Sequence, residues 1–169
     1  MVHSIELVFD RDTEAAIRGI WDALATAGIP SQAPASRPHV TLVVADRIAA
    51  DVDELLRPVS RQLPLGCAVG APVLFGRGNV VFARLVVPTG ELLALHGEVH
   101  RLCAPHLSPG PMPNSLPGHW TAHVTLARRV GPAQLGRALR IADRPAQIDG
   151  HFSGLRRWDG TKRAEYPIS

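Results

Sequence analysis

The chain contains one short segment twice. The copies are His39-Val40-Thr41-Leu42 and His123-Val124-Thr125-Leu126, each a His-x-Thr within an apolar, β-branched run. In an extended strand successive side chains alternate between two faces, so the His and Thr of each copy share one face and the Val and Leu point to the other. Two such strands side by side would set two imidazoles and two hydroxyls around one small polar pocket. We therefore predict a fold that brings the two copies together.

The first half of the chain predicts strands that alternate with amphipathic helices. Alternating apolar residues indicate the strands, and apolar residues three or four positions apart indicate the helices. Pro58 lies inside the second helical pattern and is expected to end or kink that helix, because proline lacks the backbone N–H. In order, we expect strand 3–9, helix 13–27, a proline-containing loop over 31–38, strand 40–45, helix 51–63 and a β-like segment over 65–75.

The second half repeats this order of elements. We expect strand 80–87, helix 91–103, a proline-rich loop over 105–117, strand 121–127, helix 132–141, a strand region over 147–158 and a closing hairpin over 155–166. Both copies of the motif fall on the strand that follows a helix and a proline-containing loop. We therefore predict a single domain, residues 1–169, made of two half-repeats of about 1–76 and 77–169.

The composition is that of one compact domain. The chain has 169 residues, of which 46% are hydrophobic and 20% charged, so it carries enough apolar material for a packed core. The formal net charge of +3 tolerates an anionic substrate without indicating a protein that coats nucleic acid. Cys67 and Cys103 lack a C-x-x-C spacing, so neither a disulfide framework nor a zinc knuckle is indicated.

The first residues carry no recognisable targeting signal. No basic region is followed by an apolar core, and no apolar run approaches about 18 residues. We therefore expect a cytoplasmic monomer that does not associate with membranes.

The repeated segments resemble the motifs of the 2H phosphoesterases, and within them the RNA 2′,3′-cyclic phosphodiesterase or 2′-5′ RNA ligase-like (LigT-like) group. The resemblance rests on Pro38-His39-Val40-Thr41-Leu42, on His123-Val124-Thr125-Leu126-Ala127-Arg128 and on their separation. One His-x-Thr-Leu alone is a weak signal because short patterns recur by chance, whereas two copies in matching places are a strong one. The resemblance implies an α+β bilobal fold with pseudo-two-fold symmetry, in which two β-sheet lobes flanked by helices enclose a central cleft.

Paired histidines suit the opening of a cyclic phosphodiester. The reaction needs a base for the attacking water and an acid for the departing ribose oxygen, and the ordinary histidine pKa of about 6.5 suits both roles. The hydroxyls of Thr41 and Thr125 could donate to the phosphoryl oxygens, so the scheme needs no metal or cofactor. The resemblance implies that His39 is the proton donor and His123 the acceptor, although a pseudo-symmetric site could work in either direction.

We therefore expect a metal-independent enzyme that hydrolyses a 2′,3′-cyclic phosphate, on an RNA end or a nucleotide, to a 2′-phosphate. Three related activities would use the same residues: hydrolysis of a small cyclic nucleotide, exonuclease action at RNA 3′ ends, and 2′-5′ ligation. A non-catalytic module that binds RNA ends or nucleotides is an alternative of another class. Binding alone does not require two titratable imidazoles, which favours the enzyme.

Three flanking residues are candidates for substrate binding. Arg37 shares the alternation of the first motif and precedes a proline that favours extended backbone, so it could reach the cleft or remain a surface charge. Strict alternation turns Arg128 away from the cleft, so it either needs a twist or bulge to contact phosphate or serves an ion pair instead. Trp120 falls on the face opposite the second motif histidine, where core packing is the simpler role than stacking on a base.

A predicted helix offers a competing metal site. His96 and His100 are four residues apart and Cys103 lies one turn further, which is ligand spacing for zinc. The glutamate between the histidines is Glu98, which is misplaced for a metalloprotease motif. A solvated helix edge is the simpler interpretation, so we expect no metal.

Overall fold

The computed structural model describes residues 1–32 and 35–169, and within them the chain forms a seven-stranded sheet flanked by helices. The strands follow the order β2-β1-β8-β4-β5-β7, with β9 beside β8, and the pairings between them are antiparallel. The strands of this sheet are β1 (His3–Phe9), β2 (His39–Ala45), β4 (Leu65–Phe75), β5 (Val80–Val86), β7 (His123–Val130), β8 (Ile148–Asp159) and β9 (Ala164–Ile168).

Helices and two short strands complete the described fold. The helices are α1 (Arg11–Thr26), α2 (Val52–Leu55), α3 (Arg57–Ser60), α4 (Gly90–Cys103) and α5 (Pro132–Ala142), with 3₁₀ turns at Ala104–His106 and Pro113–Ser115. The short strands β3 (Arg47–Ile48) and β6 (Leu107–Ser108) pair with each other. No helix in the described ranges is long and apolar enough to cross a membrane.

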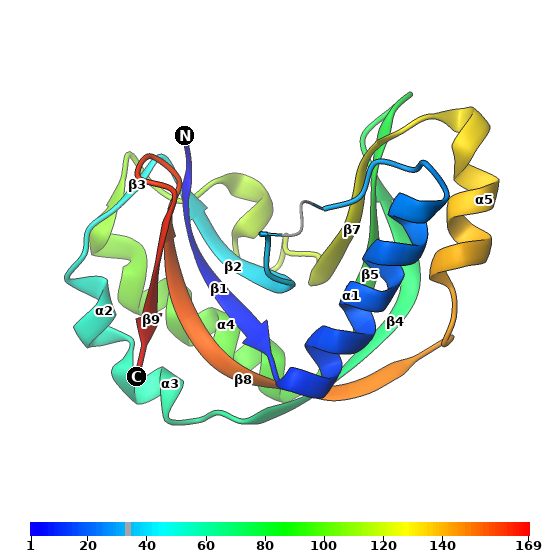
Figure 1. Cartoon of the computed structure of the whole chain (residues 1–169). Coiled ribbons are helices and arrows are strands. Elements are labelled where there is room, and N and C mark those ends of the chain that lie inside the picture. Colours follow the sequence, from blue (N-terminus) through cyan, green and yellow to red (C-terminus); the bar gives the residue numbers. More distant parts are fainter. Residues whose placement is uncertain (33–34) are drawn as a thin grey trace.

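Strand β8 runs through both lobes of the molecule (Figure 1). Its first part pairs with β4 and its last part with β9, while β1 pairs along its other side. The first lobe therefore contains β1, β2, β9 and the end of β8, and the second contains β4, β5, β7 and the start of β8. This is the α+β bilobal fold that the sequence predicted, with the sheets of the two lobes continuous through β8. Each lobe also takes strands from both of the half-repeats expected from the sequence.

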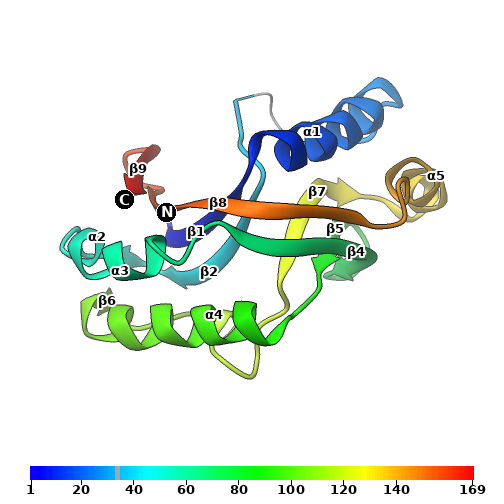
Figure 2. The same ribbon diagram turned by 90° about the horizontal axis from the view of Figure 1, so that it is seen from below.

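Helices α1 and α4 each follow a strand of one lobe and pack on the other lobe. Helix α1 follows β1 but packs against α5, β7 and β8, and α4 follows β5 but packs against β2 and α2 (Figure 2). Each helix begins at a side-chain cap, because Asp10 accepts a hydrogen bond from the backbone N–H of Thr13 and Thr89 accepts one from that of Leu92. In each half of the chain, the helix that follows the first strand thus crosses to the other lobe.

Most predicted elements are confirmed with boundaries that move by a few residues. The predicted helix 51–63 is instead two short helices that meet at Leu56, because Pro58 supplies no N–H to continue the first. The strands β3 and β6 were not predicted, since two residues are too few to show a period. The loop expected over 31–38 includes residues 33–34, which lie outside the described residues.

The second lobe is held together by a fully buried arginine, Arg84 of β5. Its guanidinium donates to backbone carbonyls of β4, of the last residue of α5 and of the segment that follows α5. Burial lowers the pKa of the guanidinium. The acceptors, at 2.7 to 3.3 Å, are Val69, Gly70, Ala142, Pro145 and Ala146.

Replacing Arg84 by Met should lower the free energy of unfolding by about 3 kcal/mol or more, because each buried acceptor left unpaired costs about 1 to 3 kcal/mol. Urea denaturation measures the change. The matched control is Arg137→Met, since Arg137 is an exposed arginine of α5 and its loss should change the free energy by no more than about 0.5 kcal/mol. Equal stability of the two variants would contradict the role of Arg84.

Candidate active site

The two motif strands are the ends of the strand order and lie against each other across the molecule. β2 pairs only with β1, and β7 only with β5, among the described strands. In each motif the His and Thr are half-buried while the Val and Leu are fully buried, as alternation predicts. The structure therefore brings His39, Thr41, His123 and Thr125 to facing edges of the two lobes.

Both motif histidines are held in the same way. Nδ1 of His39 lies 2.8 Å from the carbonyl oxygen of Arg37, and Nδ1 of His123 lies 2.7 Å from that of Thr121. A carbonyl only accepts, so Nδ1 of each ring carries a proton and donates it. In both residues Nε2 is therefore the nitrogen that is available to exchange a proton with a bound molecule.

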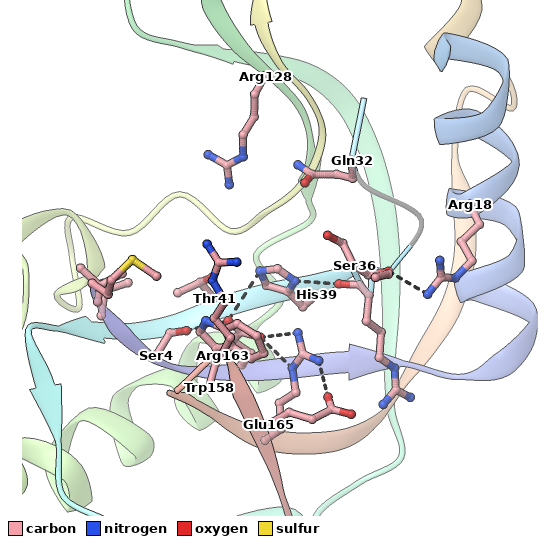
Figure 3. A pocket seen from close by; sticks show the side chains of 17 residues that line it. Ser4, Arg18, Gln32, Ser36, His39, Thr41, Arg128, Trp158, Arg163 and Glu165 are labelled. Atoms are coloured by element: carbon pink, nitrogen blue, oxygen red, sulfur yellow. Dashed lines mark hydrogen bonds and ion pairs between the residues drawn. The ribbon is translucent and has the colours of Figure 1, made fainter. Parts of the chain in front are cut away.

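The motif residues line two adjoining pockets. The larger, of about 890 Å³, contains His39 and extends over β1, β2 and the β8–β9 hairpin (Figure 3). The smaller, of about 420 Å³, contains His123 and Thr125. Thr41 and Arg128 line both pockets, so the pockets meet between the two histidines. Both volumes are within the range of about 300 to 1,000 Å³ that is usual for small-molecule sites.

The two histidines have unlike electrostatic surroundings. Burial lowers the pKa of His123. The ring of Phe75 contributes to this burial, since its centre lies 4.5 Å from that of His123. Electrostatic interaction with His39 and with the positive charge of Arg128 lowers this pKa further, against the opposing effect of the hydrogen bond to the Thr121 carbonyl. His123 is consequently neutral at pH 7. His39 instead faces an acid, because its Nε2 lies 3.6 Å from Oε1 of Glu6.

Glu6 is a buried carboxylate that the sequence interpretation missed. It is 3% exposed, and on β1 it lies between Thr41 of β2 and Arg156 of β8. Its Oε1 accepts a hydrogen bond of 2.6 Å from Ser4, and its Oε2 accepts one of 2.8 Å from Nε of Arg156. The carboxylate is therefore fixed beside His39.

A signal for Glu6 was present in the sequence. An acid stands within the apolar run that ends this strand, on the face opposite Ile5 and Leu7. A buried charge in such a place needs a partner. The partner, Arg156, is 150 positions away, so the sequence pattern could not identify it.

Arg128 reaches the pockets because β7 is irregular. Its pairing with β5 shifts register on both sides of Phe82, and the next residue, Arg129, has a φ of 55°. Such bulges rotate a strand and change the face to which a side chain points. Figure 3 shows the Arg128 side chain extending from β7 toward the wall that bears Thr41. Its guanidinium has no ion pair with a carboxylate of the described residues.

The other two flanking candidates lie at the pockets but have protein partners. Arg37 lines the larger pocket, and its Nε lies 2.9 Å from a carboxylate oxygen of Glu14 on α1. Trp120 lines the smaller pocket, stacks on His96 with ring centres 3.8 Å apart, and donates from Nε1 to the Thr41 carbonyl at 2.9 Å. Packing therefore accounts for the position of Trp120.

The interpretation of His96 and His100 as a solvated helix edge is wrong. Their exposed fractions are 1% and 7%, because α4 packs on β2, and Nε2 of each ring lies 3.0 and 2.9 Å from the Leu42 carbonyl. Burial lowers the pKa of His96 to about 4 and raises that of the Cys103 thiol to about 12. The described residues include no group of three or more His, Cys, Asp or Glu placed to hold a metal ion.

The electrostatic difference between the histidines is testable by titration. His123 should titrate below the ordinary value of about 6.5, and Arg128→Gln should raise its pKa toward that value, because a positive charge that disfavours the imidazolium is removed. NMR of the ring carbons across pH measures this. The control is Arg129→Gln, which removes a neighbouring charge that lines neither pocket. An unchanged pKa in Arg128→Gln would contradict the assignment.

Comparisons with known proteins place this geometry in context. Residues 10–161 match the family model described as the 2′-5′ RNA ligase superfamily. No curated protein sequence matches the chain. Among solved structures, TT0787 of Thermus thermophilus is 15% identical with a TM-score of 0.61 and covers 100% of this chain and 96% of its own. E. coli LigT is 12% identical with a TM-score of 0.60, over 99% and 94% of the two chains. Usb1 of Kluyveromyces marxianus is 14% identical with a TM-score of 0.55, over 99% and 97%.

Proposed function

Since the chain belongs to the 2′-5′ RNA ligase superfamily of 2H phosphoesterases, we propose that it hydrolyses the 2′,3′-cyclic phosphate of an RNA end or a nucleotide to a 2′-phosphate. One observation carries this proposal: two histidines are each fixed through Nδ1, and they line adjoining pockets with Nε2 available. This is the arrangement that acid and base catalysis at one phosphorus requires. A single chain supplies both histidines, so a monomer contains the whole site.

The unlike surroundings of the histidines assign opposite roles to them. The lowered pKa of His123 keeps it neutral at pH 7, as the acceptor of a proton from water must be. His39 faces Glu6 across 3.6 Å, a contact that becomes an ion pair when the ring carries the proton that a donor gives up. These roles agree with those that the family resemblance implies.

The proposed reaction is a balanced hydrolysis. A water oxygen attacks phosphorus while His123 takes its proton, the bond from phosphorus to the ribose 3′ oxygen breaks, and His39 protonates that oxygen. Charge on the phosphoryl oxygens is held by the hydroxyls of Thr41 and Thr125 and by the guanidinium of Arg128. Every step uses a group of the chain or water.

Structures of similar proteins support a nucleotide substrate. E. coli LigT has been solved in complex with 3′-AMP and with NADP⁺, and Kluyveromyces marxianus Usb1 with uridine monophosphate. Each is a nucleotide bound to a protein of the same fold, and the two pockets described above have volumes suited to such a molecule.

Product analysis tests the proposal. Oligonucleotides and mononucleotides with a 2′,3′-cyclic phosphate should be converted to 2′-phosphates, both with and without excess chelator, because the acid, the base and the anion donors are all protein groups. Mass spectrometry and phosphorus NMR identify the product and the position of its phosphate. Ordinary internal phosphodiesters, which lack the ring, should remain intact.

Each other outcome contradicts a defined part of the proposal. A 3′-phosphate as sole product would contradict the proposal that the ribose 3′ oxygen is the leaving group. Loss of turnover in chelator, restored by zinc, would overturn the metal-independent scheme. Nucleotide binding without any turnover would contradict enzymatic activity and would support a non-catalytic binding module.

A further inference from the structure

The larger pocket extends well beyond the motif residues, to the hairpin formed by β8 and β9. Its wall there carries Arg156 and Trp158 of β8, Glu165 of β9 and Arg163 of the turn between them. The pocket is near the upper end of the usual volume range for small-molecule sites. The hydrolysis proposed above does not account for this part of the wall.

The larger pocket is lined by more positive than negative side chains. Within the described residues its charged lining comprises Arg18, Arg37, Arg128, Arg156 and Arg163, with the carboxylates Glu6 and Glu165. Arg156 contacts both of these carboxylates, whereas Arg18 and Arg37 pair with Glu14 outside the pocket.

Two guanidiniums of the larger pocket have no ion pair with any described carboxylate, those of Arg128 and Arg163. They stand on different lobes, on β7 and on the β8–β9 turn (Figure 3). Two separate cations along one pocket suit a ligand with two separate phosphates.

The turn holds Arg163 in an unfavourable backbone conformation. Its φ is 53°, in the left-handed region, which costs an ordinary side chain roughly 1 to 2 kcal/mol and which glycine adopts freely. The turn is nevertheless well fixed, because Oδ1 of Asp159 accepts from the N–H groups of Thr161 and Lys162 at 3.0 Å each. The turn therefore presents Arg163 from a fixed backbone position on the pocket wall.

Trp158 gives the same wall a flat aromatic surface. Its side chain is half-buried, lines the larger pocket and lies beside Arg156, whose guanidinium carbon is 5.9 Å from the ring centre. The arginine beside the ring is paired with carboxylates, whereas Arg163 on the same wall is not. An aromatic ring and an unpaired cation on one wall are the combination with which proteins hold single-stranded nucleic acid, because the ring stacks on a base and the cation binds the backbone.

We propose that this wall binds the nucleotide on the 5′ side of the cyclic end, with Arg163 on the linking phosphodiester and Trp158 stacked on the base. The inference rests on the proposed function and adds a second nucleotide subsite to it. The substrate is the 3′ end of an RNA strand of two or more nucleotides, held by Arg128 at the cyclic phosphate and by Arg163 one phosphate upstream.

Matched glycine variants test the subsite. The wild type should have a KM at least about 10-fold lower for a dinucleotide with a cyclic end than for the cyclic mononucleotide with the same 3′ base, since the extra stacking and phosphate contacts are each worth about 1 kcal/mol or more. Arg163→Gly should abolish most of this ratio without lowering stability. Arg129→Gly is the control: it removes an exposed arginine with a φ of 55° that lines neither pocket, and it should keep the ratio.

Calorimetry separates failure of the subsite from failure of the reaction. The probes are 2′-phosphorylated mononucleotide and dinucleotide, titrated at several salt concentrations. Arg163→Gly should lower the salt dependence of dinucleotide affinity by about 0.7 in log–log slope, the value for one phosphate contact on a single strand. Equal effects on both probes, or none, would overturn the subsite. A preserved preference for dinucleotide binding without turnover would support the subsite and overturn only the proposed reaction.

Discussion

The arrangement of the site depends on hydrogen bonds to the free backbone carbonyls of the two motif strands. The indole N–H of Trp120 donates to the carbonyl of Thr41 at 2.9 Å, and that of Trp21 donates to the carbonyl of Thr125 at 3.1 Å. These acceptors belong to strands that end the sheet and so have an unpaired edge. Each indole therefore provides the hydrogen bond that the strand's carbonyl lacks, and it fixes the backbone of a threonine that lines the cleft.

The connecting segments cover the same edges in a crossed manner. Pro30, which precedes β2 in the chain, lies beside β7, where its carbonyl accepts from the N–H of Arg128 at 3.1 Å. The segment that leads into β7 lies along β2, where Met112 donates to the Val44 carbonyl at 2.8 Å. Each motif strand is thus held by a residue that precedes the other motif strand in the chain. Helix α1 likewise precedes β2 but packs on β7, and helix α4 precedes β7 but packs on β2. The pseudo-symmetry therefore includes the helices that pack on the motif strands.

Local patterns in the sequence were sufficient for the strands of the large sheet, the long helices and the facing motifs, because each depends on spacing within a few residues. They were insufficient where a distant partner decides the outcome. The burial of His96 depends on α4 crossing to β2, the direction of Arg128 depends on register shifts against β5, and the role of Glu6 depends on Arg156. The electrostatic difference between the two histidines comes from the burial of His123, from Arg128 beside it and from Glu6 beside His39, none of which a local pattern shows. The residue pattern alone therefore predicted a symmetric pair, and only the family resemblance implied a donor and an acceptor.

The most direct test of paired acid and base catalysis is the single-turnover rate on a cyclic phosphate across pH. The rate should rise and then fall with pH, and His39→Ala and His123→Ala should each lower it by at least about 100-fold. The double variant should be little slower than the poorer single, because residues that act as a unit are not additive. His119→Ala, which removes another histidine from the smaller pocket, should leave the profile bell-shaped and the rate within about 10-fold. A near-native rate in either motif variant, with its fold intact by circular dichroism, would contradict the two-histidine mechanism.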